Sequence, residues 1–463
     1  MRIFDSDQSL EKTIRVVGIF ALILSIGVTF STFNSGLKHS YFFADDFLGL
    51  ALFRDAQGLL NLEASAGRPI TNIYFFLTTK IFGGDQNTPF LIINFLLLVL
   101  ALVLFVASET RRWQTWSIGT IFTICLLIGS GSLFPLIFWA SNFNHVFCIL
   151  LFSAIILMYQ INTASQNECL IICQSILYFV LISSNPLFSP FLLTGLVTLV
   201  LDFNRPKSIA SSRMKLLVLN TFVRVILPVF YILFISLPYL FKNNQYRLGL
   251  IESLLKNLRF YSLLDGYSLA LVLSTFLLVL LYSVYLTVQR KNYDQLSFLI
   301  SGLAILTIVL IQENQQGLHY LIIPTMLLAP ILVQNLNDKF LHPVGKLLLV
   351  SILTVTLAFS FDSSSSIRSY FSKTPWGSNL TSVNNEIVKM NLSGIDVCVK
   401  SNGEFDDWAN FIAQVGGANF FLRTEIGAKS VVFVDKIACP KNIDFTTILV
   451  SKSESNMFKA IKQ

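Results

Sequence analysis

Charged residues are scarce in this chain: Asp, Glu, Lys and Arg make up only 13% of its 463 residues, while 54% of the residues are hydrophobic. This balance lies well outside the range of soluble globular domains and indicates a polytopic membrane protein. Cysteine is also rare, with six residues, and the four histidines are scattered along the chain without the spacing of metal ligands. The sequence shows no repeat of fixed period, which argues against a solenoid.

Long apolar runs account for most of the chain. A helix that crosses ~30 Å of hydrocarbon needs roughly 20 mostly apolar residues. On this rule about eleven spans are expected, at residues 14–32, 90–106, 116–133, 143–159, 169–183, 186–201, 216–240, 267–288, 298–311, 320–333 and 347–361. Asn185 and Pro186 separate the fifth run from the sixth and predict a tight reversal there. We therefore expect an all-α membrane bundle over residues 1–361.

Basic residues flank the spans on one side if the spans alternate in direction. Examples before the first span and after the second are Arg2, Lys12, Arg15, Arg111 and Arg112. Cytoplasmic loops retain an excess of Lys and Arg, so the N-terminus is expected in the cytoplasm and the C-terminus outside it. The first loop, residues 34–89, is then external. We favour an uncleaved anchor for the first span over a signal peptide, because "TFSTFNSG" lacks a clean cleavage site.

The tail changes character after the last span. A serine-rich linker over residues 362–378 precedes a segment, residues 379–463, in which "GIDVCVK" and "KSVVFVD" predict strands and "FDDWANFIAQVGG" predicts a helix. This pattern indicates a small extracytoplasmic α/β domain. Cys398 and Cys439 lie in it, and an oxidising compartment would allow a disulfide between them, which the sequence alone leaves open.

The net charge of +7 raises the question of a nucleic-acid partner. The basic residues are instead spread over membrane loops and are not interleaved with aromatic residues on one soluble face, so membrane lipid is the better partner. Phosphate on a lipid carrier would suit external cations such as Arg68, Lys242 and Arg247.

The first external loop holds the most informative stretch. Asp45 and Asp46 follow the first span, and two apolar stretches too short to span lie on either side of "SAGRP". These stretches predict helices along the membrane surface. Pro69 presets the first turn of the second helix, whose free backbone donors favour a nearby anion.

The order "ADDF", "FRDAQG" and "GRPITN" resembles membrane glycosyltransferases of the GT-C architecture, most closely the bacterial O-antigen glucosyltransferases of the serotype-conversion type. The motifs cover residues 41–84, and the rest of the chain matches in layout. The resemblance implies a bacterial inner-membrane enzyme that moves a hexose, glucose in these relatives, from a polyprenyl phosphate to a lipid-linked or surface glycan such as lipopolysaccharide. "GLHYLIIP" has His319 where such enzymes often have arginine, followed by Tyr320.

Elementary chemistry gives the acids a role independently. A sugar hydroxyl that attacks an anomeric carbon needs a base, and a carboxylate can serve as one. The resemblance implies that Asp45 is this base and that Asp46 orients the acceptor or a surface helix; the two could exchange roles. The phosphate leaving group needs positive charge rather than a proton, and a single displacement inverts the anomeric centre. Arg54 and Glu313 join Tyr320 as expected substrate-binding residues. No cofactor is expected, and a divalent metal is left open.

Two alternatives remain: a flippase for lipid-linked oligosaccharides and an O-antigen polymerase. A flippase needs charged residues along a central path, where the apolar runs offer little beyond Arg224. That arginine lies two to three turns from Lys215, and we interpret it as reaching back to the cytoplasmic face. A polymerase would be expected to carry an arginine-rich late external loop, and the loop after residue 240 is only modestly basic.

Overall fold

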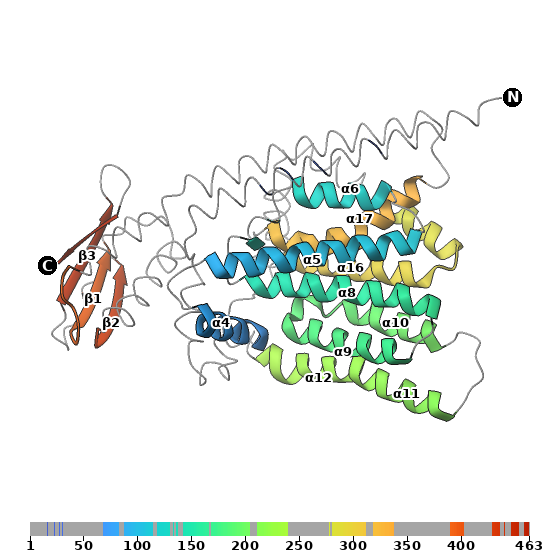
Figure 1. Ribbon diagram of the computed structural model, residues 1–463, viewed down its shortest axis with the longest axis horizontal. Helices are drawn as coiled ribbons and strands as arrows, with labels where there is room; N and C mark the ends of the chain where they lie inside the picture. Colours follow the sequence, from blue (N-terminus) through green and yellow to red (C-terminus); the bar gives the residue numbers. More distant parts are fainter. Residues whose placement is uncertain are drawn as a thin grey trace.

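The computed structural model is mostly helical, with its helices side by side in a bundle and a small β-sheet beyond one end (Figure 1). The structure describes residues 68–82, 88–113, 118–129, 142–165, 168–203, 211–238, 280–311, 318–337, 389–401, 428–435, 446–452 and 458–462, with the single residues 16, 23, 27, 30, 133, 136, 137, 277 and 439. Apart from four of those single residues, the predicted span 14–32 lies outside this set, as do the predicted span 347–361 and the predicted linker.

The helices keep the labels of Figure 1. They are α4 (Pro69–Phe82), α5 (Thr88–Trp113), α6 (Ile118–Gly129), α8 (Phe143–Ser165), α9 (Glu168–Ser184), α10 (Phe191–Phe203), α11 (Ser211–Thr221), α12 (Leu227–Tyr231), α16 (Tyr293–Ile311) and α17 (Ile322–Asn337). Short 3₁₀ segments are η2 (Pro186–Phe188) and η5 (Leu318–Leu321), and π-helical turns are η3 (Phe222–Ile226) and η4 (Ile232–Ser236).

Four helices within the described residues are long and apolar enough to cross a membrane, as expected of a helical membrane protein. They are Thr88–Arg112, Phe143–Asn162, Lys215–Ser236 and Tyr293–Leu310. Shorter apolar helices occupy Glu168–Ser184, Phe191–Leu201, Leu280–Gln289 and Ile322–Val333, each overlapping a predicted span. The count of about eleven spans stays a prediction.

Helix α5 shows how an apolar helix divides between core and lipid. Leu98, Ala101 and Phe105 recur at helical spacing and are buried in the main core cluster. Leu96 and Val103, on another face, are exposed. Because no water is present in the hydrocarbon layer, an exposed apolar face of this kind suits contact with lipid.

The predicted reversal between the fifth and sixth apolar runs is confirmed. Helix α9 ends at Ser184, the single turn η2 follows, and α10 begins at Phe191. Asn185 caps the turn, because its Oδ1 accepts a hydrogen bond from the Leu187 backbone N–H at 3.1 Å. Pro186 occupies the first position of the turn, where its missing N–H is not needed.

Close contacts between helices depend on small and hydroxyl-bearing residues. A Cβ atom built on Gly302 of α16 would lie 3.0 Å from atoms of Leu327 and Leu328 in α17, so only glycine fits without displacement. The Thr194 hydroxyl of α10 lies 2.8 Å from that of Ser301 in α16. These contacts fix α16 between α10 and α17.

The two ends of the bundle differ in composition. Ring contacts bring together the first turns of α5 and α8 with α4 at one end, which we call the Arg68 end (Figure 1). At the opposite end, which we call the Arg112 end, the Arg112 guanidinium lies 5.2 Å from the Phe298 ring centre near the start of α16. Basic residues at the Arg112 end include Arg111, Lys215, Arg290 and Lys291.

A four-stranded sheet lies near the C-terminus. Its strands β1 (Asp396–Ser401), β2 (Ser430–Asp435), β3 (Thr446–Lys452) and β4 (Phe458–Lys462) are ordered β2-β1-β3-β4. Strand β1 runs parallel to both neighbours, and β4 pairs antiparallel with β3. The first two strands lie where the sequence predicts them; the helix predicted between them lies outside the described residues, and the limits of a separate domain stay a prediction.

The structure joins Cys398 of β1 to Cys439 in a disulfide, with the two Cα atoms 6.1 Å apart. Cys398 and its neighbour Val397 are fully buried in the central strand. The bond therefore ties the middle of the sheet to the segment between β2 and β3.

Candidate functional site

Most of the charged residues that the sequence singles out lie outside the described part of the chain. This group comprises Asp45, Asp46, Arg54, Lys242, Arg247 and Glu313. The backbone of His319 lies in η5, and its side chain is not described. Their assigned roles stay predictions, whereas Arg68 and Tyr320 can be placed.

Arg68 immediately precedes α4, which begins at Pro69 as predicted. Its carbonyl oxygen accepts a hydrogen bond from the Thr71 N–H at 3.1 Å, so Arg68 starts the first turn. The side chain is half-buried, and it lies near enough to α8 for its charge to act on Cys148. With fourteen residues, α4 is shorter than the ~20 residues that a span requires.

An aromatic cluster fixes α4 against the bundle. The Tyr74 ring stacks on Phe143 of α8 with 3.7 Å between ring centres and meets Phe90 of α5 edge-on at 5.5 Å. The Tyr74 hydroxyl lies 3.1 Å from the Phe90 carbonyl oxygen and 3.2 Å from Asn94 Oδ1, either of which can accept its proton. The Asn94 amide in turn donates to the carbonyl oxygen of Leu136 at 3.1 Å. Arg68 is therefore held at the start of a well-anchored helix.

The opening turns of α8 supply the polar side of this region. Asn144 and His145 are both buried, and the His145 ring packs edge-on against Tyr320 with 4.9 Å between ring centres. Cys148, which faces the charge of Arg68, lies one turn further along the same helix. The structure thus brings Arg68 and Tyr320 to neighbouring turns of α8, although the sequence places them about 250 residues apart.

The interpretation of Arg224 as reaching back to the cytoplasmic face is wrong. Its side chain is 0% exposed, and η3, the π-helical turn that carries it, faces α9 and α10. The guanidinium donates five hydrogen bonds, to Gln174 Oε1 at 3.1 Å, Ser175 Oγ at 3.1 Å, Thr198 Oγ1 at 3.3 Å and two backbone carbonyl oxygens at 3.3 and 3.4 Å.

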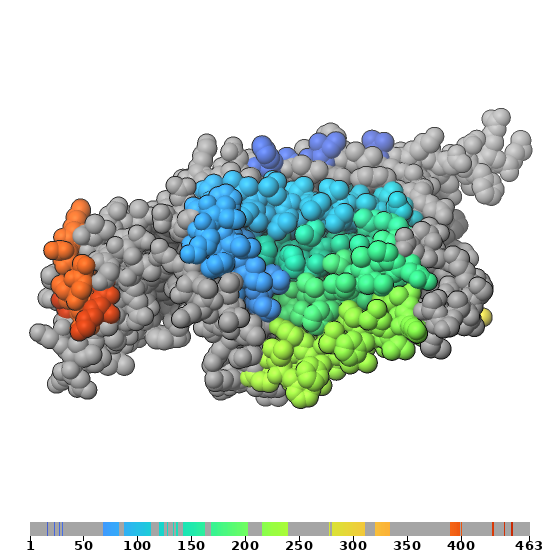
Figure 2. All heavy atoms as spheres, turned by 60° about the horizontal axis from the view of Figure 1, so that its bottom comes forward, coloured from blue at the N-terminus to red at the C-terminus, as the bar shows by residue number. Residues whose placement is uncertain are grey.

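Two further contacts complete the surroundings of Arg224. Its guanidinium lies 5.1 Å from the Tyr178 ring centre, and Ser175 bonds Asn220 at 2.6 Å. Figure 2 shows α11 and α12 along the edge of the bundle with their outer surface open. Apolar side chains exposed on these two helices include Leu219 and Phe230. Arg224 is thus turned inward, and its bonds join three helices across the apolar layer.

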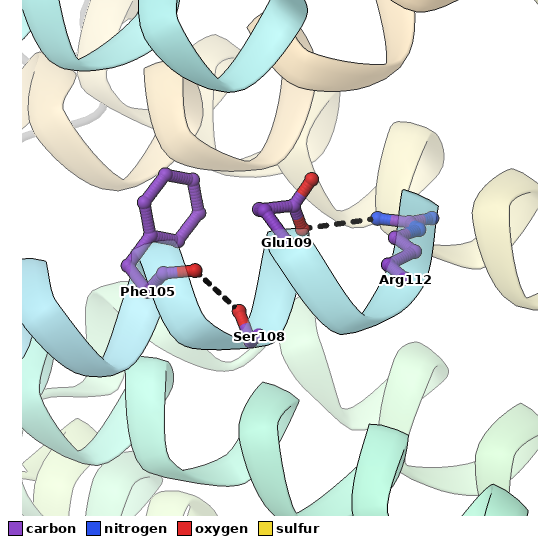
Figure 3. A network of polar contacts seen from close by, with 4 residues as sticks. All are labelled: Phe105, Ser108, Glu109 and Arg112. Atoms are coloured by element: carbon purple, nitrogen blue, oxygen red, sulfur yellow. Dashed lines mark hydrogen bonds and ion pairs between the residues drawn. The ribbon is translucent and has the colours of Figure 1, made fainter. Parts of the chain in front are cut away.

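At the Arg112 end, Glu109 is a buried charged residue that the sequence analysis did not single out. Arg112 Nη1 and Glu109 Oε1 are 3.5 Å apart on the last turns of α5, and the Glu109 side chain is 1% exposed (Figure 3). Ser108 Oγ donates to the Phe105 carbonyl oxygen at 2.7 Å beside them. With Arg112 over the Phe298 ring, this group links the end of α5 to α16.

Buried polar residues that sequence reasoning missed include Asn94, Glu109, Gln174 and Thr198. Asn94, Gln174 and Thr198 interrupt predicted apolar runs, which is the signal by which they could have been found, whereas Glu109 follows such a run. Within the described ranges, no three His, Cys, Asp or Glu side chains come together as metal ligands. Sequence comparisons add no assignment: no protein-family model matches the chain, and no curated protein matches it.

Proposed function

We propose that the protein is an inverting membrane glycosyltransferase that moves a hexose from a polyprenyl phosphate to a lipid-linked or surface glycan. The observation that carries the proposal is the position of Arg68, at the start of α4 and against the polar opening turns of α8. A guanidinium there can grip two oxygens of a lipid phosphate, and the first turn of α4 adds backbone donors. The resemblance of the acidic loop supplies the reaction class.

Each residue then has a distinct chemical task. Asp45 takes the proton of the acceptor hydroxyl as the new bond forms at the anomeric carbon, and Asp46 orients the acceptor. The C1–O bond to phosphate breaks at the same time, and its electron pair stays on the bridging oxygen, so that a phosphate group that is already anionic leaves with a second negative charge. Arg68 stabilises that charge, together with the cations predicted near it: Lys242, Arg247 and His319. Arg54, Glu313 and Tyr320 contact the sugars.

The distribution of basic residues supports an extracytoplasmic site. Arg111, Arg112, Lys215 and Arg290 gather at the end of the bundle opposite Arg68. Because cytoplasmic loops retain Lys and Arg, that end is cytoplasmic and the Arg68 end faces outward. The apolar runs and the resemblance of the acidic loop lead us to propose a GT-C-like bundle of about eleven spans in a bacterial inner membrane. Its C-terminal domain is placed outside the cytoplasm.

The flippase alternative finds little support in Arg224. Its guanidinium already donates five hydrogen bonds within the bundle, and a passing lipid phosphate would have to displace several of them. Breaking bonds to a buried charge costs about 1.5–3 kcal/mol each. Arg224 is therefore better suited to holding helices together than to lining a transport path.

Substitution of Arg68 tests the donor-binding role. Purified protein in lipid is titrated with a polyprenyl-phosphate hexose, and donor affinity is compared among wild type, Arg68→Lys and Arg68→Ala. Lysine keeps the charge but loses the two-pronged contact, so we expect partial affinity for Arg68→Lys and loss of most affinity for Arg68→Ala. Arg111→Ala, at the opposite end, is the control. Equal affinity of wild type and Arg68→Ala would remove Arg68 from the site.

Thiol labelling tests the orientation. Cysteines introduced at Ser40 and Ser65 are expected to react with an impermeant reagent in intact cells, and one at Ser208 is not. The native Cys169, at the Arg112 end and exposed, serves as an internal control that should react only after the membrane is opened. The reverse pattern would place the acids in the cytoplasm and point to a nucleotide-sugar donor.

A further inference from the structure

The side-chain amide of Asn144 is buried in a way that needs an explanation. Asn144 is the second residue of α8 and is 2% exposed. Its Nδ2 atom has no hydrogen-bond partner among the described residues, and its Oδ1 accepts a weak bond from Cys148 Sγ at 4.0 Å. A buried polar atom left unpaired costs about 1–3 kcal/mol, and a bound ligand can supply the missing partner.

The surroundings of this amide connect it to the proposed donor site. Asn144 and Cys148 lie four residues apart, so they share one face of α8 and are separated by ~6 Å along its axis. Cys148 lies within the electrostatic reach of Arg68. The neighbouring His145 packs against Tyr320. The unpaired amide thus lies on the same turns of α8 as Cys148, on which the Arg68 charge acts, and His145, which packs against Tyr320.

The chemistry of an amide selects among possible ligands. A primary amide both donates and accepts hydrogen bonds, as a sugar hydroxyl does, whereas a phosphate anion is better stabilised by a cation. In a hexosyl phosphate the hydroxyl groups lie directly beside the phosphate. An amide one helical turn from Cys148, on the helix on which the Arg68 charge acts, is therefore placed to meet the sugar.

We propose that Asn144 binds a hydroxyl group of the donor hexose and thereby contributes to the choice of sugar. This inference rests on the proposed function, because it takes the ligand of Arg68 to be a sugar-bearing lipid phosphate. A site built to pair with a hydroxyl discriminates strongly against a ligand that lacks it, since its own polar group is then left unpaired. The buried, unpaired amide of Asn144 is the structural sign of such a site.

Replacement of Asn144 by leucine of similar size tests the proposal with two probes. The full-length protein in lipid nanodiscs is titrated with farnesyl phosphate that carries glucose and with farnesyl phosphate alone. We expect Asn144→Leu to weaken binding of the glucose-bearing probe roughly tenfold, the effect of one good hydrogen bond, and to leave binding of farnesyl phosphate unchanged. Thermal unfolding should be unchanged or shifted upward, because leucine removes an unpaired buried donor.

Ser153→Ala is the matched control. Ser153 is also on α8 and fully buried, and its Oγ likewise has no partner among the described residues. It lies nine residues from Asn144, ~13.5 Å along the helix, so its replacement should change binding of neither probe. If Asn144→Leu does not fold, Asn144→Ala, which also removes the polar group, replaces it with the same expectation for the two probes.

The outcomes separate the two proposals. If the Asn144 variant binds both probes as wild type does, Asn144 does not recognise sugar, while the proposed function stands. Equal weakening of both probes would mean a general disturbance of the site and would also overturn the inference. If wild type binds neither probe, the proposed function fails and the role of Asn144 fails with it.

Discussion

Replacement of Arg224 by lysine is the sharpest test of how the bundle is held together. The arginine donates five hydrogen bonds to groups on α9 and α10, at 3.1–3.4 Å. A lysine ammonium has three donors, so at least two of these bonds are lost while the charge stays buried. Taking the lower value of about 1.5 kcal/mol for a bond to a charged group, Arg224→Lys should lower the free energy of unfolding by roughly 3 kcal/mol.

Reversible unfolding in mixed micelles, followed by circular dichroism, measures this free energy. A loss of roughly 3 kcal/mol changes the ratio of folded to unfolded protein by about a hundredfold, which is a large part of the stability of most proteins. Arg111→Lys is the control, since Arg111 is an exposed residue at the end of α5. If Arg224→Lys unfolds like wild type and like this control, the five-bond description of the site is wrong.

Three other substitutions test two close contacts between helices and the disulfide of the sheet. Gly302→Ala should destabilise by about 1–3 kcal/mol, because the new methyl group would lie 3.0 Å from Leu327 atoms in α17; thermal unfolding measures the loss, and unchanged stability would contradict the close approach. Gly195→Ala would place a methyl group 3.1 Å from the Tyr178 ring and 3.4 Å from Arg224 Cγ, so its effect should be non-additive with Arg224→Lys in a double-mutant cycle. Cys398→Ser should remove roughly 4 kcal/mol from the sheet, given the 41-residue separation from its partner, and should abolish the reductant-dependent gel shift of wild type.

Apolar run length and turn chemistry predicted much of the helical layout. The runs now seen as α5, α8 and α9 lie where the sequence placed them, because hydrophobic length is a local property of the chain. The break at Asn185 and Pro186 was predicted for the same reason: backbone restriction by proline acts on its immediate neighbours.

The surroundings of Arg224 could not be predicted in this way. Because Arg224 lies only two to three turns from Lys215, the sequence suggested that its guanidinium reaches the cytoplasmic surface of the membrane. The outcome depends instead on Gln174, Ser175 and Thr198, which come from two other helices. Packing decides which face of a uniformly apolar helix turns inward. The hydrophobic periodicity of the sequence gives little information on this choice, because lipid and protein core are equally apolar.

The candidate site was predictable only in part. The sequence proposed Arg68 and Tyr320 from local motifs, but nothing local indicates that both lie against the same turns of α8. The stacking of Tyr74 on Phe143, which sets the position of α4, links segments about 70 residues apart. Such contacts depend on tertiary structure, and the acidic pair remains a prediction from sequence.

Mass spectrometry of surface glycan tests directly whether the protein transfers a hexose. Cells that lack the protein are compared with cells that carry wild type or the double variant Asp45→Asn, Asp46→Asn at equal membrane abundance. We predict that wild type adds one hexose to the acceptor unit and that the double variant lowers the modified fraction by about 10² or more, the usual effect of a lost general base. Identical glycan masses with and without the wild-type protein, or full modification by the double variant, would contradict the assignment.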